Sequence, residues 1–268
     1  MIKRVVTAIL LASFFFVVLF VGGWVAITAL MACLFLSLYE VFDVIKKAGH
    51  RPIVWPAWAC WAIGVPLTAC FYDPFLLMIL VITACFVACS LLLFRNKPEL
   101  EDVFFSVLPI FSVLLPGLCI LNFFKAEAQY VQNIFIILSF SIPLVGDIFA
   151  FFSGKRFGKR KLCPAVSPNK TIEGAIGGLC GSMLSSLICW LLLQLFGTSL
   201  PFWHFILLGI VGGVAGQIGD LFASLIKRHC KVKDFGTIFP GHGGMMDRMD
   251  STFFSAVVVF MYFGIAIC

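Results

Sequence analysis

Charge is the scarcest property of this sequence. Only 12% of its 268 residues are charged, against about a quarter in soluble globular domains, whereas 62% are hydrophobic and the mean hydropathy is +1.09. The apolar residues come in repeated runs, and a membrane-spanning helix needs roughly 20 of them. These features exclude a soluble globular domain and predict an all-α integral membrane protein.

Several familiar site motifs are also missing. The eleven cysteines contain no C-x-x-C pair and mostly lie in apolar runs, so we interpret them as small packing residues. The four histidines include no H-x-x-x-H pair, so the sequence does not predict zinc. No G-x-S-x-G elbow supports serine hydrolysis, and the "DFG" at 234–236 lacks the other kinase motifs.

Hydropathy predicts about nine transmembrane helices. The first run lacks an A-x-A-like cleavage site and is followed at once by a second, so we expect it to be retained rather than cleaved. The predicted spans are approximately 5–22, 24–42, 53–71, 74–94, 103–124, 132–152, 171–196, 203–227 and 251–268.

The placement of lysine and arginine predicts the orientation. With a cytoplasmic N-terminus, the cytoplasmic segments and the adjoining span edge carry 18 of the 19 basic residues, and Lys125 alone lies elsewhere. This asymmetry follows the positive-inside rule and places the C-terminus on the opposite side. The basic loops lack interleaved aromatic residues, so we expect the lipid bilayer, and no nucleic acid, as a partner.

The polar chemistry divides the chain into two predicted domains. Residues 1–124 form a scaffold whose five spans contain few ionisable groups apart from Glu40 and Asp43 at a cytoplasmic edge. Residues 125–268 form a catalytic membrane domain of four spans, with cytoplasmic loops at 153–170 and 228–250.

Five acids of the second domain are predicted to meet at the cytoplasmic ends of four helices. An ionised carboxylate inside a span costs at least about 2.5–3.5 kcal/mol, so each needs a partner, a metal or a polar cavity. Simpler roles stay open: an ion pair with lysine, complementing a helix dipole, or capping the last span. These acids are Asp147, Glu173, Asp220, Asp247 and Asp250.

The two cytoplasmic loops suit a phosphorylated substrate. Loop 153–170 holds six basic residues and no acid, and Ser167–Pro168 resembles a helix start that could bind an anion. In loop 228–250, the "PGHGG" segment can bring backbone N–H groups close to a phosphate. Carboxylates beside such groups suit Mg²⁺ and metal-assisted phosphoryl or nucleotidyl transfer.

The segment "SLIKRHCKVKDFGTIFPGHGGMMDRMD" (224–250) resembles the signature of phosphatidate cytidylyltransferases, also called CDP-diacylglycerol synthases. The upstream run 147–174 resembles the same family, although Ile172 stands where an aromatic residue is common. The matching signature positions are Ser224, Lys227, Arg228, Lys233, Asp234, Pro240, His242, Gly243, Gly244, Asp247, Arg248 and Asp250. The matching upstream positions are Asp147, Lys159, Ser167, Pro168, Lys170, Thr171, Glu173 and Gly174.

The resemblance implies a membrane enzyme that joins CTP and phosphatidic acid, with Mg²⁺ and an optional second cation, to give CDP-diacylglycerol and pyrophosphate. It also implies a homodimer and a multi-pass protein of the cell (inner or plasma) membrane with its site at the cytoplasmic face. We expect metal ligands at Asp220, Asp247, Asp250 and Asp147. We expect catalytic roles for Lys227, Arg228, Arg248, Lys233, Asp234 and His242. We expect substrate-binding roles for Ser167, Lys170, Thr171, Glu173, Ser224, Gly243 and Gly244.

Three other functions stay open. A CTP-dependent lipid kinase of the polyprenol or phytol type would release CDP instead of pyrophosphate. A CDP-alcohol phosphotransferase would use the D-x-x-D of Asp247 and Asp250, but its D-G-x-x-A-R lead-in is missing. A transporter would use intramembrane acids near the midplane, often with repeats.

Overall fold

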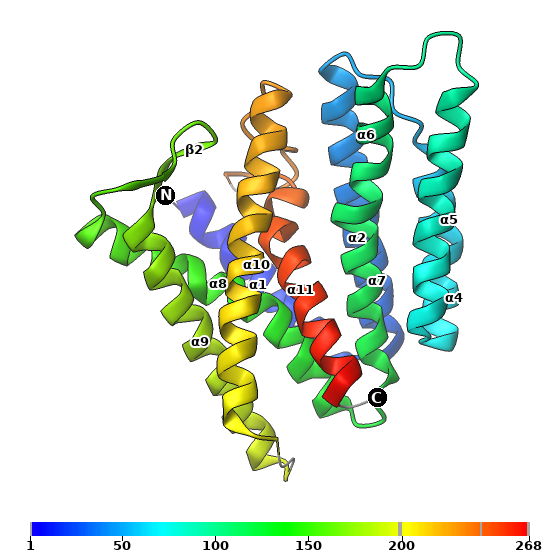
Figure 1. The fold of residues 1–268 in the computed structure, drawn as a ribbon. Coiled ribbons are helices and arrows are strands. Elements are labelled where there is room, and N and C mark those ends of the chain that lie inside the picture. Colours follow the sequence, from blue (N-terminus) through cyan, green and yellow to red (C-terminus); the bar gives the residue numbers. More distant parts are fainter. Residues whose placement is uncertain (1, 198–199, 242, 267–268) are drawn as a thin grey trace. The chain divides into compact units, whose positions relative to one another are not determined.

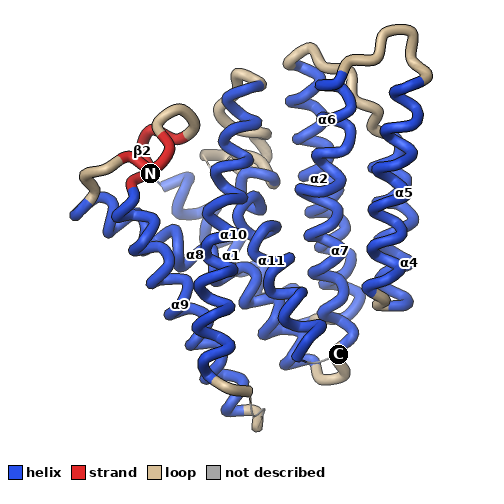
Figure 2. Tube along the Cα trace, viewed as in Figure 1, coloured by secondary structure: helices blue, strands red, loops and turns tan. Residues whose placement is uncertain are grey.

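The computed structural model describes residues 2–197, 200–241 and 243–266, and it confirms the all-α prediction (Figure 1). The only strands in this described part form a short hairpin, red in Figure 2. The helices are α1 (Ile2–Val21), α2 (Gly23–Lys47), α3 (Trp55–Ala59), α4 (Val65–Phe71), α5 (Pro74–Leu93), α6 (Leu100–Pro109), α7 (Leu115–Leu121), α8 (Gln129–Phe157), α9 (Ile172–Leu195), α10 (Phe202–His229) and α11 (Met246–Ala266), and the strands are β1 (Lys161–Cys163) and β2 (Ser167–Thr171).

Membrane-spanning helices dominate the structure. Among the residues it describes, seven helices are long and apolar enough to cross a bilayer, and a shorter apolar helix runs from Trp55 to Phe71. The seven are Gly23–Lys47, Pro74–Leu93, Leu100–Lys125, Gln129–Phe157, Ile172–Leu195, Phe202–His229 and Met246–Ile265. The chain is therefore a multi-pass membrane protein.

Three helices extend beyond the spans that hydropathy predicts. The prediction of 24–42 is too short for α2, and that of 132–152 is too short for α8. The last helix begins at Met246 rather than near 251, so Asp247 and Asp250 lie in its opening turns and not before it. Charged residues such as lysine and arginine propagate a helix well, so backbone hydrogen bonding continues where the apolar run has ended.

Two apolar helices contain a wider π-helical turn. One turn is Cys60–Gly64, between α3 and α4, and the other is Ile110–Leu114, between α6 and α7. Each is followed closely by a proline, Pro66 or Pro116, which has no N–H to donate. A π turn relieves the clash of the proline ring with the preceding turn, so each pair of helices continues as one rod.

The chain forms two compact units. The first comprises Met1–Lys125 and His229–Met249, and the second comprises Ala126–Arg228 and Asp250–Cys268. The fully buried leucines of the first unit, such as Leu34, Leu38 and Leu114, lie on α2 and on the π turn between α6 and α7.

In the second unit, α8 and α9 pack closely through small residues. A Cβ added at Gly181 would lie 2.8 Å from the carbonyl oxygen of Val145, so no larger residue fits there without a shift. The same face of α9 includes Gly174 and Gly178. The small-residue spacing that the sequence shows in this helix therefore serves packing within one subunit.

Candidate active site

The signature loop of the first unit, residues 233–245, is held together by Asp247, which follows it in α11. The Oδ2 atom of Asp247 accepts backbone hydrogen bonds from Phe235 (2.8 Å) and Gly244 (2.9 Å). The N–H of Phe239 donates to the carbonyl of Gly243 (2.9 Å). The φ of Gly243 is +79°, and a Cβ there would press on the Asp247 carboxylate. The glycines of this loop therefore let the backbone wrap around a carboxylate.

A second carboxylate reaches the same loop from α2. Glu40, only 3% exposed, accepts hydrogen bonds from the N–H groups of Met245 (3.0 Å) and Met246 (2.8 Å). A Cβ at Gly236 or Gly244 would collide with this carboxylate. Because the first N–H groups of a helix have no partner within it, Glu40 both satisfies the start of α11 and complements its dipole.

The role of Glu40 was missed by the sequence prediction, which placed it in a scaffold. The available signal was a lone carboxylate in an apolar span, which usually faces a polar partner. The structure also contradicts the capping alternative for Asp247 and Asp250. Asp247 binds N–H groups that precede it, and Oδ1 of Asp250 accepts from the adjacent N–H of Ser251 (2.7 Å).

In the second unit, the structure brings together Lys170 and Asp220, two predicted site residues far apart in the sequence. The Nζ atom of Lys170, on β2, lies 2.5 Å from Oδ2 of Asp220, on α10. Their side chains are 28% and 27% exposed, so water and ligands still reach them. On α10, Asp220, Ser224 and Lys227 are all half-buried, as expected for the polar stripe that their spacing predicts.

The predicted helix start at Ser167–Pro168 is wrong. These residues belong to β2, which pairs antiparallel with β1 through Lys161 opposite Thr171 and Cys163 opposite Ser167. Helix α9 begins at Ile172 instead, and the Thr171 hydroxyl accepts the N–H of Gly174 (3.1 Å) as its cap. Ser followed by Pro favours the start of a helix locally, but pairing with β1 holds this segment in an extended conformation.

Glu173 supports the base of the hairpin. Both of its carboxylate oxygens lie 3.3 Å from the backbone nitrogen of Arg160, which donates to them. At the other end of the hairpin, Nε of Arg228 donates to the carbonyl of Val166 (3.5 Å). The basic hairpin is thus attached to α9 and α10, and several of its cations, such as Lys159, remain exposed.

Helices α10 and α11 of the second unit meet beside Asp220. A Cβ at Gly219 would lie 2.6 Å from the carbonyl oxygen of Asp250 and 2.8 Å from the ring of Phe254. Asp250 is 7% exposed. The close approach needs glycine at 219 and brings the backbone at Asp250 to the turn of α10 that bears Asp220.

The other predicted site residues differ in exposure. Asp147 is exposed on α8, and in the first unit Lys233, Asp234 and Arg248 are exposed as well. His242 lies outside the described residues. The exposed cations are available to an anionic ligand.

Each unit offers donors that suit a hard divalent cation. Asp247 in the first unit, and Asp220 and Asp250 in the second, have carboxylate oxygens, which Mg²⁺ prefers to imidazole or thiolate. Carboxylates that bind a metal are usually hydrogen-bonded themselves, which fixes their orientation. The hydrogen bonds that Phe235 and Gly244 donate to Asp247 are of this kind. Asp220 already holds a cationic group, the ammonium of Lys170.

Comparison with known proteins assigns the family of the chain without reference to the geometry of the site. Residues 2–266 match the model of the family described as "Cytidylyltransferase family". A phosphatidate cytidylyltransferase of Staphylococcus haemolyticus is 32% identical over 253 residues, which cover 94% of each chain. One from Bacillus subtilis is 46% identical over 121 residues, 45% of this chain and 43% of its own. One from Staphylococcus aureus is 37% identical over 160 residues, 60% of this chain and 58% of its own.

Proposed function

The chain belongs to the cytidylyltransferase family, and we propose that it transfers the cytidylyl group of CTP to phosphatidic acid in phospholipid biosynthesis. The observation that carries the proposal is the signature loop, in which Asp247 and Glu40 bind four backbone N–H groups. Both carboxylates shape a glycine-rich loop whose neighbours in the sequence are cationic, as a triphosphate site requires.

The reaction forms one P–O bond and breaks another. A phosphate oxygen of phosphatidic acid attacks the α-phosphorus of CTP, and the bond from that phosphorus to the β-phosphate oxygen breaks to release pyrophosphate. The attacking phosphate is anionic at neutral pH, so no strong general base is needed. Positioning and charge stabilisation carry most of such a reaction.

We assign the chain's residues to those two tasks. Lys227, Arg228 and Arg248 neutralise the triphosphate and the departing pyrophosphate, while Lys170 and Thr171 hold a phosphate. Mg²⁺, held by Asp220 and Asp247 with Asp250 next, would supply charge neutralisation on the phosphate oxygens when bound. Asp147, Lys233, Asp234 and His242 complete the proposed site, and a second cation remains an option.

The assay that tests the proposal follows both products. Purified protein, phosphatidic acid, Mg²⁺ and CTP labelled at the α-phosphorus should give labelled CDP-diacylglycerol and an equal amount of pyrophosphate. A lipid kinase would leave the label in CDP and phosphorylate the lipid. Absence of both products, with the protein folded, would contradict the proposal and favour transport.

The same reaction in sealed membrane vesicles tests the proposed topology. We propose nine spans with a cytoplasmic N-terminus, a C-terminus on the opposite side and the site at the cytoplasmic face of the cell membrane. The hairpin cations and Arg228 support this orientation through the positive-inside rule. Added CTP should react in inside-out vesicles and not in right-side-out vesicles, because CTP does not cross a bilayer. The reverse result would contradict the orientation.

Loss of the Lys170 charge should weaken CTP binding. We expect Lys170→Gln to raise the KM for CTP roughly 10- to 100-fold, since a hydrogen bond to a charged group contributes about 1.5–3 kcal/mol. Steady-state kinetics would measure this change. Lys125→Gln is the matched control, because it removes an exposed lysine on the side of the membrane opposite to the proposed site. An unchanged KM in Lys170→Gln would exclude Lys170 from the phosphate site.

A homodimer remains a prediction of the family resemblance. The close glycine face of α9 does not bear on it, because that face packs against α8 of the same subunit. The mass of the purified protein in detergent would decide the question.

A further inference from the structure

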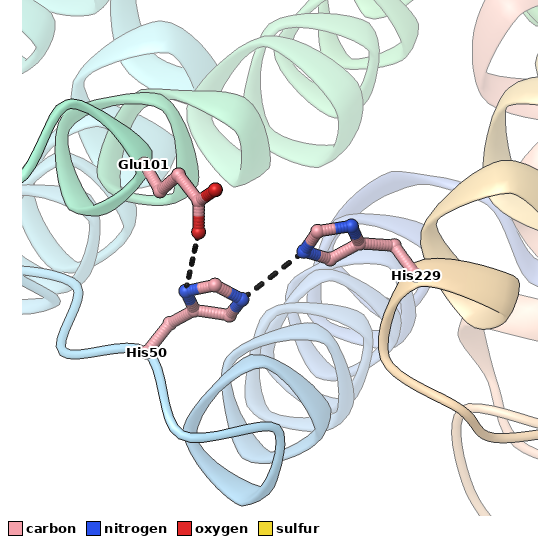
Figure 3. A group of neighbouring side chains, drawn as sticks. All are labelled: His50, Glu101 and His229. Atoms are coloured by element: carbon pink, nitrogen blue, oxygen red, sulfur yellow. Dashed lines mark hydrogen bonds and ion pairs between the residues drawn. The ribbon is translucent and has the colours of Figure 1, made fainter.

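Two histidines and a glutamate that the proposed reaction does not use lie together in the first unit (Figure 3). The Nε2 atoms of His50 and His229 are 3.1 Å apart, and Nδ1 of His50 is 3.5 Å from Oε2 of Glu101. One possible ligand atom from each residue lies within 4.8 Å of the others. The residues come from the loop after α2, from the start of α6 and from the last position of α10.

The loop that carries His50 is tied to the helix that carries Glu101. The N–H of Arg51 donates to Oδ1 of Asp102 (2.7 Å), and the N–H of Ile53 donates to the Ser106 hydroxyl (2.8 Å). Asp102 is buried and directly follows Glu101. His50 and Glu101 are thus each one residue away from a fixed contact, so their proximity is a product of the fold.

Aromatic packing holds both imidazole rings. Phe105 lies 4.3 Å from the ring of His50 and 5.3 Å from that of His229, between ring centroids. The two imidazoles are stacked at 5.3 Å with an interplanar angle of 21°. The side chain of His50 is 14% exposed and that of Glu101 is 66% exposed, so the rings are supported while an ion can still enter.

Cys230, the residue that follows His229, takes no part in the cluster. Cys230 is buried, and it is not among the residues whose possible ligand atoms lie within 4.8 Å of one another. The ligand set is therefore two imidazole nitrogens and one carboxylate oxygen.

We propose that His50, His229 and Glu101 form a site for a divalent transition metal, with Zn²⁺ as the best fit. Two histidines and one glutamate are an established zinc ligand set, with water completing a tetrahedron. Zinc–nitrogen bonds of about 2.0–2.1 Å in a tetrahedron put the two nitrogens about 3.3 Å apart, close to the observed 3.1 Å. Mg²⁺ prefers oxygen ligands, so this site is distinct from the carboxylates assigned to CTP.

Metal binding would have a structural consequence for the first unit. His229 directly precedes the segment 230–245, which contains the signature loop. A metal bound to His229, His50 and Glu101 fixes the beginning of that segment against α6, while Asp247 binds Gly244 and Glu40 binds Met245 at its end. Zinc therefore stabilises the folded chain by binding to the native state.

The test is zinc binding by the full-length protein in detergent, in competition with a chromophoric zinc chelator and with excess Mg²⁺ to occupy the oxygen sites. We expect one Zn²⁺ per wild-type chain, and at least a tenfold weaker affinity in His229→Ala and in Glu101→Gln. Co²⁺ in place of zinc should give the visible absorption of a tetrahedral site with nitrogen ligands, and His229→Ala should lose it.

His204→Ala provides the matched control. His204 belongs to the second unit, where its Nδ1 lies 3.0 Å from the Tyr262 hydroxyl, and its loss should leave zinc affinity unchanged. Zinc should also raise the Tm of the wild type and of His204→Ala, but not that of His229→Ala. Glu101→Gln changes an exposed side chain, so its effect does not depend on a core variant folding. Equal affinity in the wild type and in these two site variants, or no binding by the wild type, would overturn the proposal.

Discussion

Asp247→Asn is expected to lower the rate of CDP-diacylglycerol formation on the order of a thousandfold. An asparagine oxygen can still accept the N–H groups of Phe235 and Gly244, so the loop should stay folded. The substitution removes the negative charge that we assign to Mg²⁺, and charge stabilisation of the phosphates contributes several kcal/mol. Activity at saturating CTP, compared with the Tm of the same sample, separates the two effects.

Asp247→Ala should lose both functions, with a lower Tm as well as a lower rate. The matched control is Asp43→Asn, which removes an aspartate of α2 that pairs with Lys47 at the surface. It should retain wild-type activity. If Asp247→Asn stays active with Mg²⁺, then Asp247 is a loop-forming residue and the metal assignment is wrong.

Glu40→Ala is expected to have the second largest effect, although Glu40 comes from the first domain. It leaves the N–H groups of Met245 and Met246 without their carboxylate, at a cost of about 1–3 kcal/mol for each buried donor. We expect a Tm lower by several degrees and a rate lower by about 10- to 100-fold, because the loop no longer holds one conformation. Thermal unfolding and steady-state kinetics on the same preparation would measure both.

Glu40→Gln separates geometry from charge at this position. Its single amide oxygen can still accept a hydrogen bond, so it should recover part of the stability lost in Glu40→Ala. Glu127→Ala, at an exposed glutamate, is the control and should match the wild type. Wild-type kinetics in Glu40→Ala would mean that the start of α11 does not position the signature loop for catalysis.

Most of the helical architecture was predictable from the sequence because its cause is local. Residues that avoid water occur in runs of bilayer length, and each run satisfies its own backbone hydrogen bonds as a helix. The same holds for the stripe Asp220, Ser224 and Lys227, which follows from helical spacing alone. The boundaries were less predictable, as α2 and α11 illustrate, since hydropathy reports where the chain is apolar and not where helical bonding stops.

The sequence by itself determined that this is a multi-pass membrane protein, and it predicted which residues bear its phosphate chemistry, because composition and signature spacing are properties of the chain. Only the tertiary structure decided which distant residues meet. Glu40 reaches the start of α11 across 206 residues, and His50 reaches His229 across 179. Likewise, Ser167 pairs with Cys163 in the β-hairpin, although Ser167–Pro168 locally favours the start of a helix. Contacts at such separations depend on how helices pack against one another, and that packing cannot be predicted from a local stretch of sequence.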